Sequence, residues 1–558
     1  MAYQRLVRSV SLAVVVGCLG YGLGGYPLIE PDEGRNAEVA REMAETNDYV
    51  LPTLNGLPYL DKPILFFAAG ALVMELAGPS EIAARLPALV FTLLTLLVVA
   101  WLGRRLFGAE GAWIAALVCG ASPFTIAYAR TVIFDSAVTL WIVVALAAFY
   151  AATERPDDDR TWRWSVLAWI AIGLGVLTKG PVALAIPLMV AIPYAVWRRA
   201  WKAVLDPVGM LAFVAVVLPW VLLVSRRIPD FLHYVLVVET VERLTTDALG
   251  RTGPIWYFFP ILLGAALPWT VVVLACIDRR TIKPAAWDRR SVFLVLWIAA
   301  PLLFFTLSQS KRPQYILPLI PAVGLLTAQL WTAPRCRARG ARAGGITLLV
   351  LGLGIAATRH WIVGLFQTTE AVAAVIPSTA LLLGGFCILC GAVTVLLAHT
   401  RDLALLALAV PVIAIPIVAM PLMRAIAEDR SSAALAGTLA RVAPSGAEVV
   451  AIGVYPLSLA FYLGRHLTLV TADGSELTSN YVARHDDVLR RIPGSTLRPP
   501  GWWAEALTFC ERPRIFLTRR DAEEVRARLA ERLPILAETR KFAAYGPCGV
   551  ADLARSED

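Results

Sequence analysis

The residues best suited to chemistry lie directly after the first apolar segment of the chain. Asp32, Glu33 and Arg35 begin a polar stretch there, and Asp61 and Lys62 follow later in it. Carboxylates and cations are costly near a bilayer, so such a cluster at the end of an apolar segment indicates a functional site. Carboxylates can accept protons or stabilise positive charge, and cations can hold a phosphate. We therefore expect the reaction centre in this stretch.

The composition places this stretch in a membrane protein. Of the 558 residues, 58% are hydrophobic and only 17% are charged, and the mean hydropathy is +0.66. Soluble domains contain roughly 45–50% apolar residues. The chain is therefore expected to be a polytopic all-α membrane protein.

Apolar segments long enough to cross a bilayer recur along most of the chain. About thirteen spans are predicted, at 9–27, 87–107, 111–129, 136–152, 163–178, 181–197, 203–224, 255–276, 291–308, 314–332, 344–365, 373–398 and 403–424. The first is expected to be a retained signal anchor, because no clear cleavage site follows it. The short apolar stretch 63–78 is expected to be a re-entrant or interfacial helix.

Loop charges predict the orientation, because Lys and Arg accumulate in short cytoplasmic loops. With a cytoplasmic amino terminus, inside and outside loops alternate along the chain, and the basic residues cluster in the inside loops. These residues are Arg104, Arg105, Arg155, Arg160, Arg163, Arg198, Arg199, Lys202, Arg279, Arg280, Lys283, Arg289, Arg290, Arg335, Arg337, Arg339 and Arg342. The net charge of +9 then reflects topology, so we expect no nucleic-acid partner. The carboxy-terminal segment is expected outside.

The polar residues that look chemical all fall on the outer side in this topology. They are Asp32, Glu33, Arg35, Tyr59, Asp61, Lys62, Asp135, Lys179, Glu239, Lys311 and Tyr315. A single extracytoplasmic site explains this distribution most simply. Structural roles remain open for several of them, because Lys179 can snorkel to the interface and Asp135 can cap a helix. Glu38 and Glu42 are expected to face solvent.

Missing motifs narrow the chemistry. The sequence has no phosphate-binding GxxxxGK[ST] loop and no dinucleotide-binding GxGxxG fingerprint after a strand. An outer site must then use a donor that is already activated. A lipid phosphate fits this requirement, because Arg35, Lys62, Lys179, Lys311 and Arg312 supply phosphate-binding cations.

These motifs resemble those of the bacterial aminoarabinose transferases that modify lipid A, which are glycosyltransferases of the C superfold distantly similar to protein mannosyltransferases. The matching segments are Pro31–Met43, Gly56–Pro63, Asp135, Leu177–Gly180, Pro229–Phe231, His233–Tyr234, Glu239, Trp256–Tyr257, Leu267–Trp269 and Pro301–Leu317. They lie in order over roughly residues 25–335. The resemblance implies the same fold and a bacterial inner-membrane location with a periplasmic site.

The resemblance also implies inverting transfer of a sugar from undecaprenyl phosphate to lipid A or another envelope acceptor. Carried over by position, Asp32 is the catalytic carboxylate and Asp135 a second one, while Arg35, Lys62 and Tyr315 hold the donor phosphate. Tyr59, Lys179, Glu239 and Lys311 are further substrate-binding candidates. Asp61 stands where the family has an acidic residue associated with a divalent metal, so a metal is a candidate cofactor there. The chain is expected to act as a monomer among membrane lipids.

One departure from the family affects the substrate. Thr240 follows Glu239, where aminoarabinose transferases commonly carry a histidine. Transfer of a polyprenyl-phosphate hexose to a protein or surface glycan therefore stays open. A flippase for a lipid-linked anion is a third reading, although the site residues lie at one membrane surface and no inverted repeat is visible in the sequence.

Two domains are predicted. Residues 1–424 form the transmembrane transferase domain, which includes a catalytic first outside loop at 28–86. Residues 425–558 form a small periplasmic α/β domain. Strand patterns occur at 447–454, 466–470 and 514–517, with a helical pattern at 521–533. Cys510 and Cys548 both fall in the second domain. An oxidising compartment permits a disulfide between them.

Overall fold

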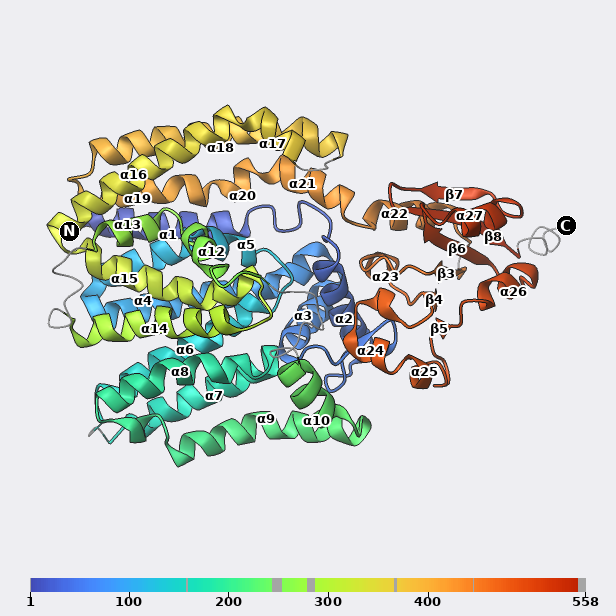
Figure 1. Cartoon of the computed structure of the whole chain (residues 1–558), viewed down its shortest axis with the longest axis horizontal. Helices are drawn as coiled ribbons and strands as arrows, with labels where there is room; N and C mark the ends of the chain where they lie inside the picture. Colours follow the sequence, from blue (N-terminus) through green and yellow to red (C-terminus); the bar gives the residue numbers. More distant parts are fainter. Residues whose placement is uncertain are drawn as a thin grey trace. The chain divides into compact units, whose positions relative to one another are not determined.

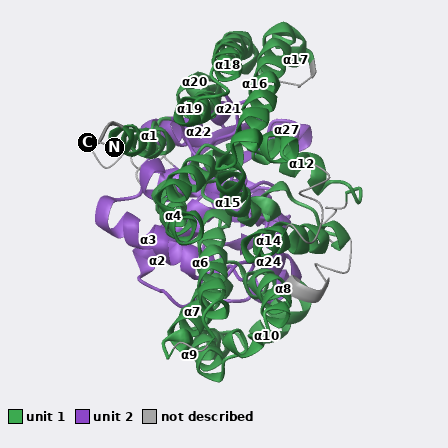
Figure 2. Cartoon of the chain, turned by 90° about the vertical axis from the view of Figure 1, so that its left-hand side faces the viewer, with its two compact units in different colours: residues 1–25, 85–425 green, residues 26–84, 426–558 purple. Residues whose placement is uncertain are grey.

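The chain is divided into two compact units in the computed structural model, which describes residues 2–156, 159–242, 253–277, 287–365, 369–444 and 446–549. The membrane unit comprises Met1–Gly25 and Arg85–Ala425, and the α/β unit comprises Tyr26–Ala84 and Ile426–Asp558 (Figure 2). The first outside loop thus belongs to the same unit as the carboxy-terminal segment. This grouping is not apparent from the sequence.

The membrane unit is built of helices (Figure 1). Their bounds are α1 (Ala2–Gly20), α4 (Glu81–Gly120), α5 (Pro123–Tyr128), α6 (Asp135–Thr153), α7 (Thr161–Lys179), α8 (Val182–Trp197), η1 (Trp201–Ala203), α9 (Pro207–Arg227), α10 (Phe231–His233), η2 (Tyr234–Glu242), α12 (Phe258–Ala265), α13 (Trp269–Ala275), α14 (Arg289–Leu307), η4 (Pro313–Leu319), α15 (Ile320–Trp331), α16 (Pro334–Ala357), α17 (Arg359–Leu365), α18 (Glu370–Leu396), α19 (Arg401–Ile413), α20 (Ile415–Val418) and α21 (Met420–Asp429). The predicted polytopic helical fold is confirmed.

The number of long apolar helices is lower than the number of predicted spans, because some of the about thirteen predicted spans share a helix or form shorter helices. Within the described residues, nine helices are long and apolar enough to cross a membrane, or ten if the bent pair α12 and α13 forms one span. Two predicted spans fall largely in α4, a 40-residue helix that bends at Gly108, where φ is 78°. The first and sixth predicted spans correspond to α1 and to α8, and α8 has only 16 residues.

Buried tryptophans and arginines satisfy backbone carbonyls inside the membrane unit. The indole N–H groups of Trp269 and Trp297 donate to the carbonyls of Ala121 and Pro318 at 2.8 and 3.0 Å. Arg130 donates to the carbonyl of Leu19 at 2.9 Å, near the carboxy-terminal end of α1. An apolar solvent offers no alternative partner for such carbonyls, so these bonds fix the helix ends in place.

The α/β unit contains the remaining elements. Their bounds are α2 (Asp32–Thr46), β1 (Thr53–Leu54), β2 (Leu57–Pro58), α3 (Leu65–Ala77), α22 (Ala433–Val442), β3 (Glu448–Ile452), α23 (Leu459–Leu463), β4 (Thr468–Val470), η5 (Ser475–Leu477), α24 (Asn480–Arg484), α25 (Asp486–Leu489), β5 (Leu497–Arg498), α26 (Trp502–Thr508), β6 (Arg514–Arg519), α27 (Glu523–Ala530), β7 (Ile535–Glu538) and β8 (Phe542–Cys548). The predicted strands and the helix after them correspond to β3, β4, β6 and α27.

A six-stranded sheet forms the centre of the α/β unit, in the order β5-β4-β3-β6-β8-β7. Strands β3 to β6 pair in parallel, whereas β8 runs antiparallel to β6 and β7. Residues on both faces of β3 are buried, including Val449 and Val450, as is typical of parallel strands covered on both sides. The disulfide between Cys510 and Cys548, which the sequence permits but does not decide, is present.

The stretch 63–78 forms α3, an apolar helix of 13 residues. A bilayer crossing needs about 20 residues, so α3 is too short to span. At Gly70, an added Cβ atom would lie 2.9 Å from the Cβ atom of Ala40 on α2. Glycine at this position therefore lets α3 approach the helix that begins with Asp32 and Glu33.

Candidate functional site

The two acids at the start of α2 have different roles. Glu33 is buried, and its carboxylate accepts a hydrogen bond from the backbone N–H of Ile29 at 2.9 Å. Asp32 keeps 34% of its side chain exposed and accepts a hydrogen bond from Arg35 at 2.5 Å. Both lie in the first turn of the helix, where negative charge is favoured. Glu33 therefore fixes the helix start, and Asp32 is the acid that remains accessible.

Arg35 links Asp32 to the carboxy-terminal segment of the same unit. Its other terminal nitrogen donates to the hydroxyl of Thr478 at 2.8 Å, and its guanidinium carbon lies 6.0 Å from the centre of the Tyr59 ring. Burial lowers the pKa of Arg35, but the charges of Tyr59, Asp32 and Asp61 outweigh this and raise it above the ordinary value. The guanidinium is a permanent cation that orients the Asp32 carboxylate.

Asp61 is held by the amino-terminal end of a helix from the carboxy-terminal segment. Its carboxylate accepts hydrogen bonds from the hydroxyl of Ser479 at 3.3 Å and from the backbone N–H groups of Asn480 and Tyr481 at 2.9 and 3.2 Å. Lys62 in turn donates to the backbone carbonyl of Asp61. Asp61 therefore fixes the turn that carries Lys62.

The metal predicted at Asp61 stays a prediction. Both carboxylate oxygens of Asp61 already accept hydrogen bonds. Among the residues that the structure describes, no group of three or more His, Cys, Asp or Glu side chains is placed to hold a metal ion. The geometry around Asp61 fits a helix cap.

A second buried acid anchors the loop that leads to Asp61. Glu42 is 1% exposed, and its carboxylate accepts hydrogen bonds from the hydroxyl of Thr53 at 2.7 Å and from the backbone N–H groups of Asn55 and Gly56 at 2.5 and 3.1 Å. His466 lies 3.5 Å from the same carboxylate. Gly56 has φ of 74°, and an added Cβ atom would lie 3.2 Å from the His466 ring. Glu42 thus secures the β1–β2 turn from within.

The expectation that Glu38 and Glu42 face solvent is wrong. Glu38 is fully buried and receives two hydrogen bonds of 2.7 Å from Arg41. Burial raises the pKa of Glu38 to about 7. For Glu42, burial acts in the same direction, but bonds from His466, Thr53 and Gly56 outweigh it and lower the pKa. A polar helix can be buried when its charges are paired in this way.

In the membrane unit, Asp135 and Lys179 form an ion pair. Asp135 is 2% exposed at the first position of α6, and Lys179 is the last residue of α7. The Lys179 ammonium lies 5.2 Å from the centre of the Tyr315 ring, and the Tyr315 hydroxyl lies 3.5 Å from that of Ser310. The structure therefore brings together three predicted site residues, and Lys179 is more than an interfacial cation.

Lys311 lies in the loop between α14 and η4. Its ammonium donates to the backbone carbonyls of Thr306 at 2.9 Å and Ser308 at 2.7 Å, and it lies 5.9 Å from the centre of the Phe258 ring. Phe258 also stacks on Tyr315, with ring centres 6.5 Å apart. Lys311 and Tyr315 are thus connected through a shared aromatic neighbour.

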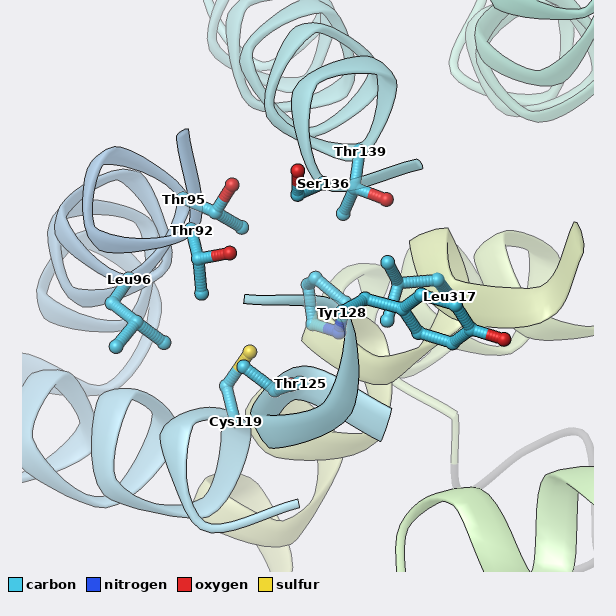
Figure 3. A pocket seen from close by; sticks show the side chains of 10 residues that line it. Thr92, Thr95, Leu96, Cys119, Thr125, Tyr128, Ser136, Thr139 and Leu317 are labelled. Atoms are coloured by element: carbon cyan, nitrogen blue, oxygen red, sulfur yellow. The ribbon is translucent and has the colours of Figure 1, made fainter. Parts of the chain in front are cut away.

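A small cavity whose lining includes several hydroxyl side chains lies beside the first turn of α6 (Figure 3). Its volume is about 20 Å³, which is room for one water molecule. Ser136 and Thr139 line it, and their buried hydroxyl oxygens have no hydrogen-bond partner among the described residues. Thr92 and Thr95 of α4 face them across the space. Leu96, Cys119, Leu317 and Pro321 complete the lining, so most of the cavity wall is apolar.

Glu239 is the remaining predicted site residue. It falls in η2, and its side chain lies outside the described residues. Arg35 and Asp61 also contact three residues that no sequence motif reveals, Thr478, Ser479 and Asn480. They belong to the carboxy-terminal segment, which carries no catalytic motif, and their only sequence signal is a serine placed to cap a short helix.

Comparison with known proteins supports the resemblance stated from the sequence. The family model of dolichyl-phosphate-mannose-protein mannosyltransferases matches residues 61–224. The undecaprenyl phosphate-alpha-4-amino-4-deoxy-L-arabinose arabinosyl transferase 2 of Sodalis glossinidius is 34% identical over 336 residues, covering 58% of this chain and 59% of that protein. The corresponding transferase of Edwardsiella ictaluri is 32% identical, covering 60% and 61%. The chain thus spans about three fifths of the length of the curated relatives it matches.

A solved structure matches almost the whole chain. The crystal structure of ArnT from Cupriavidus metallidurans bound to undecaprenyl phosphate covers 98% of both chains, with a TM-score of 0.83 and 24% identity. The structure of the same protein in the apo state gives a TM-score of 0.81. At this identity the likeness establishes the fold. The predicted multi-pass membrane fold with a small carboxy-terminal α/β region is therefore confirmed.

Proposed function

We propose that the chain is an inverting glycosyltransferase that moves a sugar from undecaprenyl phosphate to an acceptor in the cell envelope. The observation that carries the proposal is Asp32, a partly exposed carboxylate held at 2.5 Å by Arg35 in a segment that resembles the first outside loop of aminoarabinose transferases. The similarity to named arabinosyl transferases and the fold shared with an ArnT bound to undecaprenyl phosphate support it.

The reaction breaks the bond between the anomeric carbon and the phosphate oxygen, and the phosphate leaves with the electron pair. The acceptor oxygen forms the new bond from the opposite face of the sugar, which inverts the anomeric centre. Positive charge develops on the sugar, and the Asp32 carboxylate is suited to stabilise it. If the acceptor is a hydroxyl, Asp32 can also take its proton. An ionised phosphate acceptor needs no base, and Asp32 then stabilises charge or positions the nucleophile.

The leaving phosphate requires cations. In the α/β unit, Arg35 and Lys62 are candidates, with Tyr59 packed beside Arg35. In the membrane unit, Lys179 and Lys311 are candidates, with Tyr315 as an aromatic and hydroxyl neighbour. Asp135 pairs with Lys179, so we assign it the role of orienting that ammonium rather than of attacking the substrate.

The proposed sugar is 4-amino-4-deoxy-L-arabinose and the proposed acceptor is lipid A. The sugar follows the names of the arabinosyl transferases to which this chain is similar. The acceptor follows the resemblance of the sequence motifs to transferases that modify lipid A. The enzyme would then lie in the bacterial inner membrane with its reaction centre and α/β unit in the periplasm. Modification of lipid A with this cationic sugar would reduce binding of polymyxin, because it offsets negative charge on the lipid.

A second acceptor class has a specific observation in its favour. The family model that matches residues 61–224 describes transferases that use dolichyl-phosphate mannose and act on proteins. Thr240, in place of the histidine common in aminoarabinose transferases, also separates this chain from them. Transfer of a polyprenyl-phosphate hexose to a protein or surface glycan is therefore the alternative.

An assay with the purified full-length protein tests the proposal. The protein is supplied with undecaprenyl-phosphate-linked aminoarabinose and lipid A, and the products are identified by mass spectrometry. We expect transfer by the wild type and none by Asp32→Asn or Lys62→Ala. Glu45→Gln is the matched control, because Glu45 is an exposed acid on the same helix. Undiminished transfer by Asp32→Asn would overturn the proposed role of this carboxylate.

A further inference from the structure

A basic recess lies in the membrane unit, among residues with no role in the proposed reaction. It has a volume of about 870 Å³, and Arg105, Arg155, Arg198, Arg289 and Arg290 line it. These arginines come from α4, from the segment after α6, from the end of α8 and from the start of α14. In the topology derived from loop charges, all of them belong to inside loops. The recess is therefore assigned to the inside face of the membrane unit.

The charge of the recess is only partly balanced from within. Glu154 lines it and accepts a hydrogen bond from Arg198 at 2.9 Å, and it lies 3.5 Å from Arg289. Arg105, Arg155 and Arg290 form no ion pair with an acidic side chain among the described residues. Asp288, the other acid in the lining, caps α14 through the backbone N–H of Ser291 at 2.8 Å. The lining thus presents more guanidinium charge than its carboxylates neutralise.

Aromatic side chains support two of these three arginines, Arg105 and Arg290. The guanidinium carbon of Arg105 lies 5.7 Å from the Trp101 ring and 5.9 Å from the Trp164 ring, and that of Arg290 lies 5.7 Å from the Phe107 ring. Such contacts orient a guanidinium while leaving its N–H groups available. A positive-inside bias alone requires only basic residues in the loops, and it does not require five of them to line one recess.

We propose that this recess binds the phosphate headgroup of an anionic phospholipid. Guanidinium groups match phosphate oxygens in charge and geometry. A lipid is favoured over a soluble phosphate because the arginines lie at or near the ends of membrane-spanning helices, and the exposed rings of Trp197 and Trp287 also line the recess. Tryptophan favours the headgroup level of a bilayer. Basic recesses between transmembrane helices on the cytoplasmic side suit anionic headgroups for the same reasons.

Native mass spectrometry of the full-length protein in detergent tests this proposal, with phosphatidylglycerol and phosphatidylethanolamine as probes. We expect one phosphatidylglycerol to bind at least about tenfold more tightly than phosphatidylethanolamine. The variant Arg105→Gln, Arg155→Gln, Arg290→Gln should lose at least about tenfold of that affinity. The single variant Arg155→Gln, on the exposed rim, should lose roughly fivefold of the phosphatidylglycerol affinity. Because one exposed substitution should not disturb folding, this variant keeps the test valid if the triple variant fails to fold.

The matched control removes the same charge elsewhere on the same side. The variant Arg335→Gln, Arg337→Gln, Arg339→Gln should change phosphatidylglycerol affinity by less than about twofold, since screening limits distant charges. Equal weakening of phosphatidylglycerol binding by both triple variants would show that the lipid is attracted by the general electrostatic field of the basic residues and not by a specific site. That result would overturn the proposal. Displacement of the lipid by inorganic phosphate at equal concentration would also overturn it, because it would identify a soluble phosphate as the ligand.

Discussion

The carboxylate of Asp61 accepts a hydrogen bond from the backbone N–H of Asn480 at 2.9 Å, although the two residues are 419 positions apart in the chain. Ser479 and Tyr481 donate to the same carboxylate. The first outside loop and the carboxy-terminal segment are therefore joined directly beside Lys62. This relationship gives the carboxy-terminal segment a concrete role, which is to position the loop that carries candidate site residues.

Replacement of Asp61 by asparagine should loosen this junction. The amide offers only one acceptor oxygen, and it lacks the negative charge favoured at a helix start. We expect a loss of about 1–2 kcal/mol in the stability of the α/β unit, with reduced transfer because Lys62 is displaced. Thermal unfolding and activity of the purified protein measure both effects. Asp487→Asn, an exposed acid in the first turn of α25, serves as the control, and an equal loss there would contradict the positioning role.

Substitution of Arg35 by lysine should separate charge from geometry. Lysine keeps the positive charge but cannot reach both Asp32 and Thr478 with a fixed pair of N–H groups. We expect kcat to fall by roughly a hundredfold, as for loss of one preorganised electrostatic contact. Thr478→Val removes only the hydroxyl that accepts a hydrogen bond from Arg35, and it should lower kcat much less. If both variants kept wild-type kcat, the orientation of Asp32 by Arg35 would have no catalytic importance.

The ion pair of Asp135 and Lys179 should show strong coupling in stability. Lys179→Met leaves a buried carboxylate without its partner, at a cost of about 3–5 kcal/mol. The double variant Asp135→Asn, Lys179→Met removes both charges and should recover most of that stability. Activity should stay low in the double variant, because the ammonium next to Tyr315 is gone. Thermal unfolding and transfer assays on Lys179→Met, Asp135→Asn and the double variant complete the cycle. Recovery of activity in the double variant would rule out a phosphate-binding role for Lys179.

The pair of His466 and Glu42 should make the α/β unit sensitive to pH. The hydrogen bond with Glu42 raises the pKa of His466 above its usual 6.5. A raised histidine pKa stabilises the fold below about pH 6.5, and that stability is lost as the pH rises through the folded-state pKa. The loss should be at most about 1 kcal/mol, since His466 is 43% exposed and its charge is partly screened. Between pH 6 and 9, the unfolding temperature should fall less in His466→Gln than in the wild type. The same dependence of unfolding temperature on pH in both proteins would contradict a stabilising role for protonated His466.

The sequence predicts the parts of the fold that depend on local patterns. Apolar runs identify most of the spans, and alternating or continuous apolar residues identify β3, β4 and β6. The α2 helix is different, because its acids suggest an exposed face. Glu38 and Glu42 are buried nonetheless, since Arg41 and the β1–β2 turn supply their partners. No local pattern reveals that pairing.

The candidate site was predictable where its residues follow a motif and hidden where its contacts are long-range. Asp32, Arg35 and Lys62 stand out near the first apolar segment, and the Asp135–Lys179 pair joins two motifs identified separately. The bonds of Asp61 with Ser479 and of Asn55 with Leu467 join segments more than 400 residues apart. Such contacts depend on how the sheet and the first outside loop fold together, which residue types alone do not specify.

The most direct test of the central claim compares lipid A from cells that lack the gene and cells that express either the wild type or Asp32→Asn. Mass spectrometry should show lipid A carrying one added 4-amino-4-deoxy-L-arabinose only with the wild type, at equal protein levels in the membrane. A hexose added to another glycan or to a protein would select the alternative acceptor class. Surface glycolipids and proteins that are unchanged by the wild type, together with a lipid-translocation defect in Asp32→Asn, would contradict the transferase account.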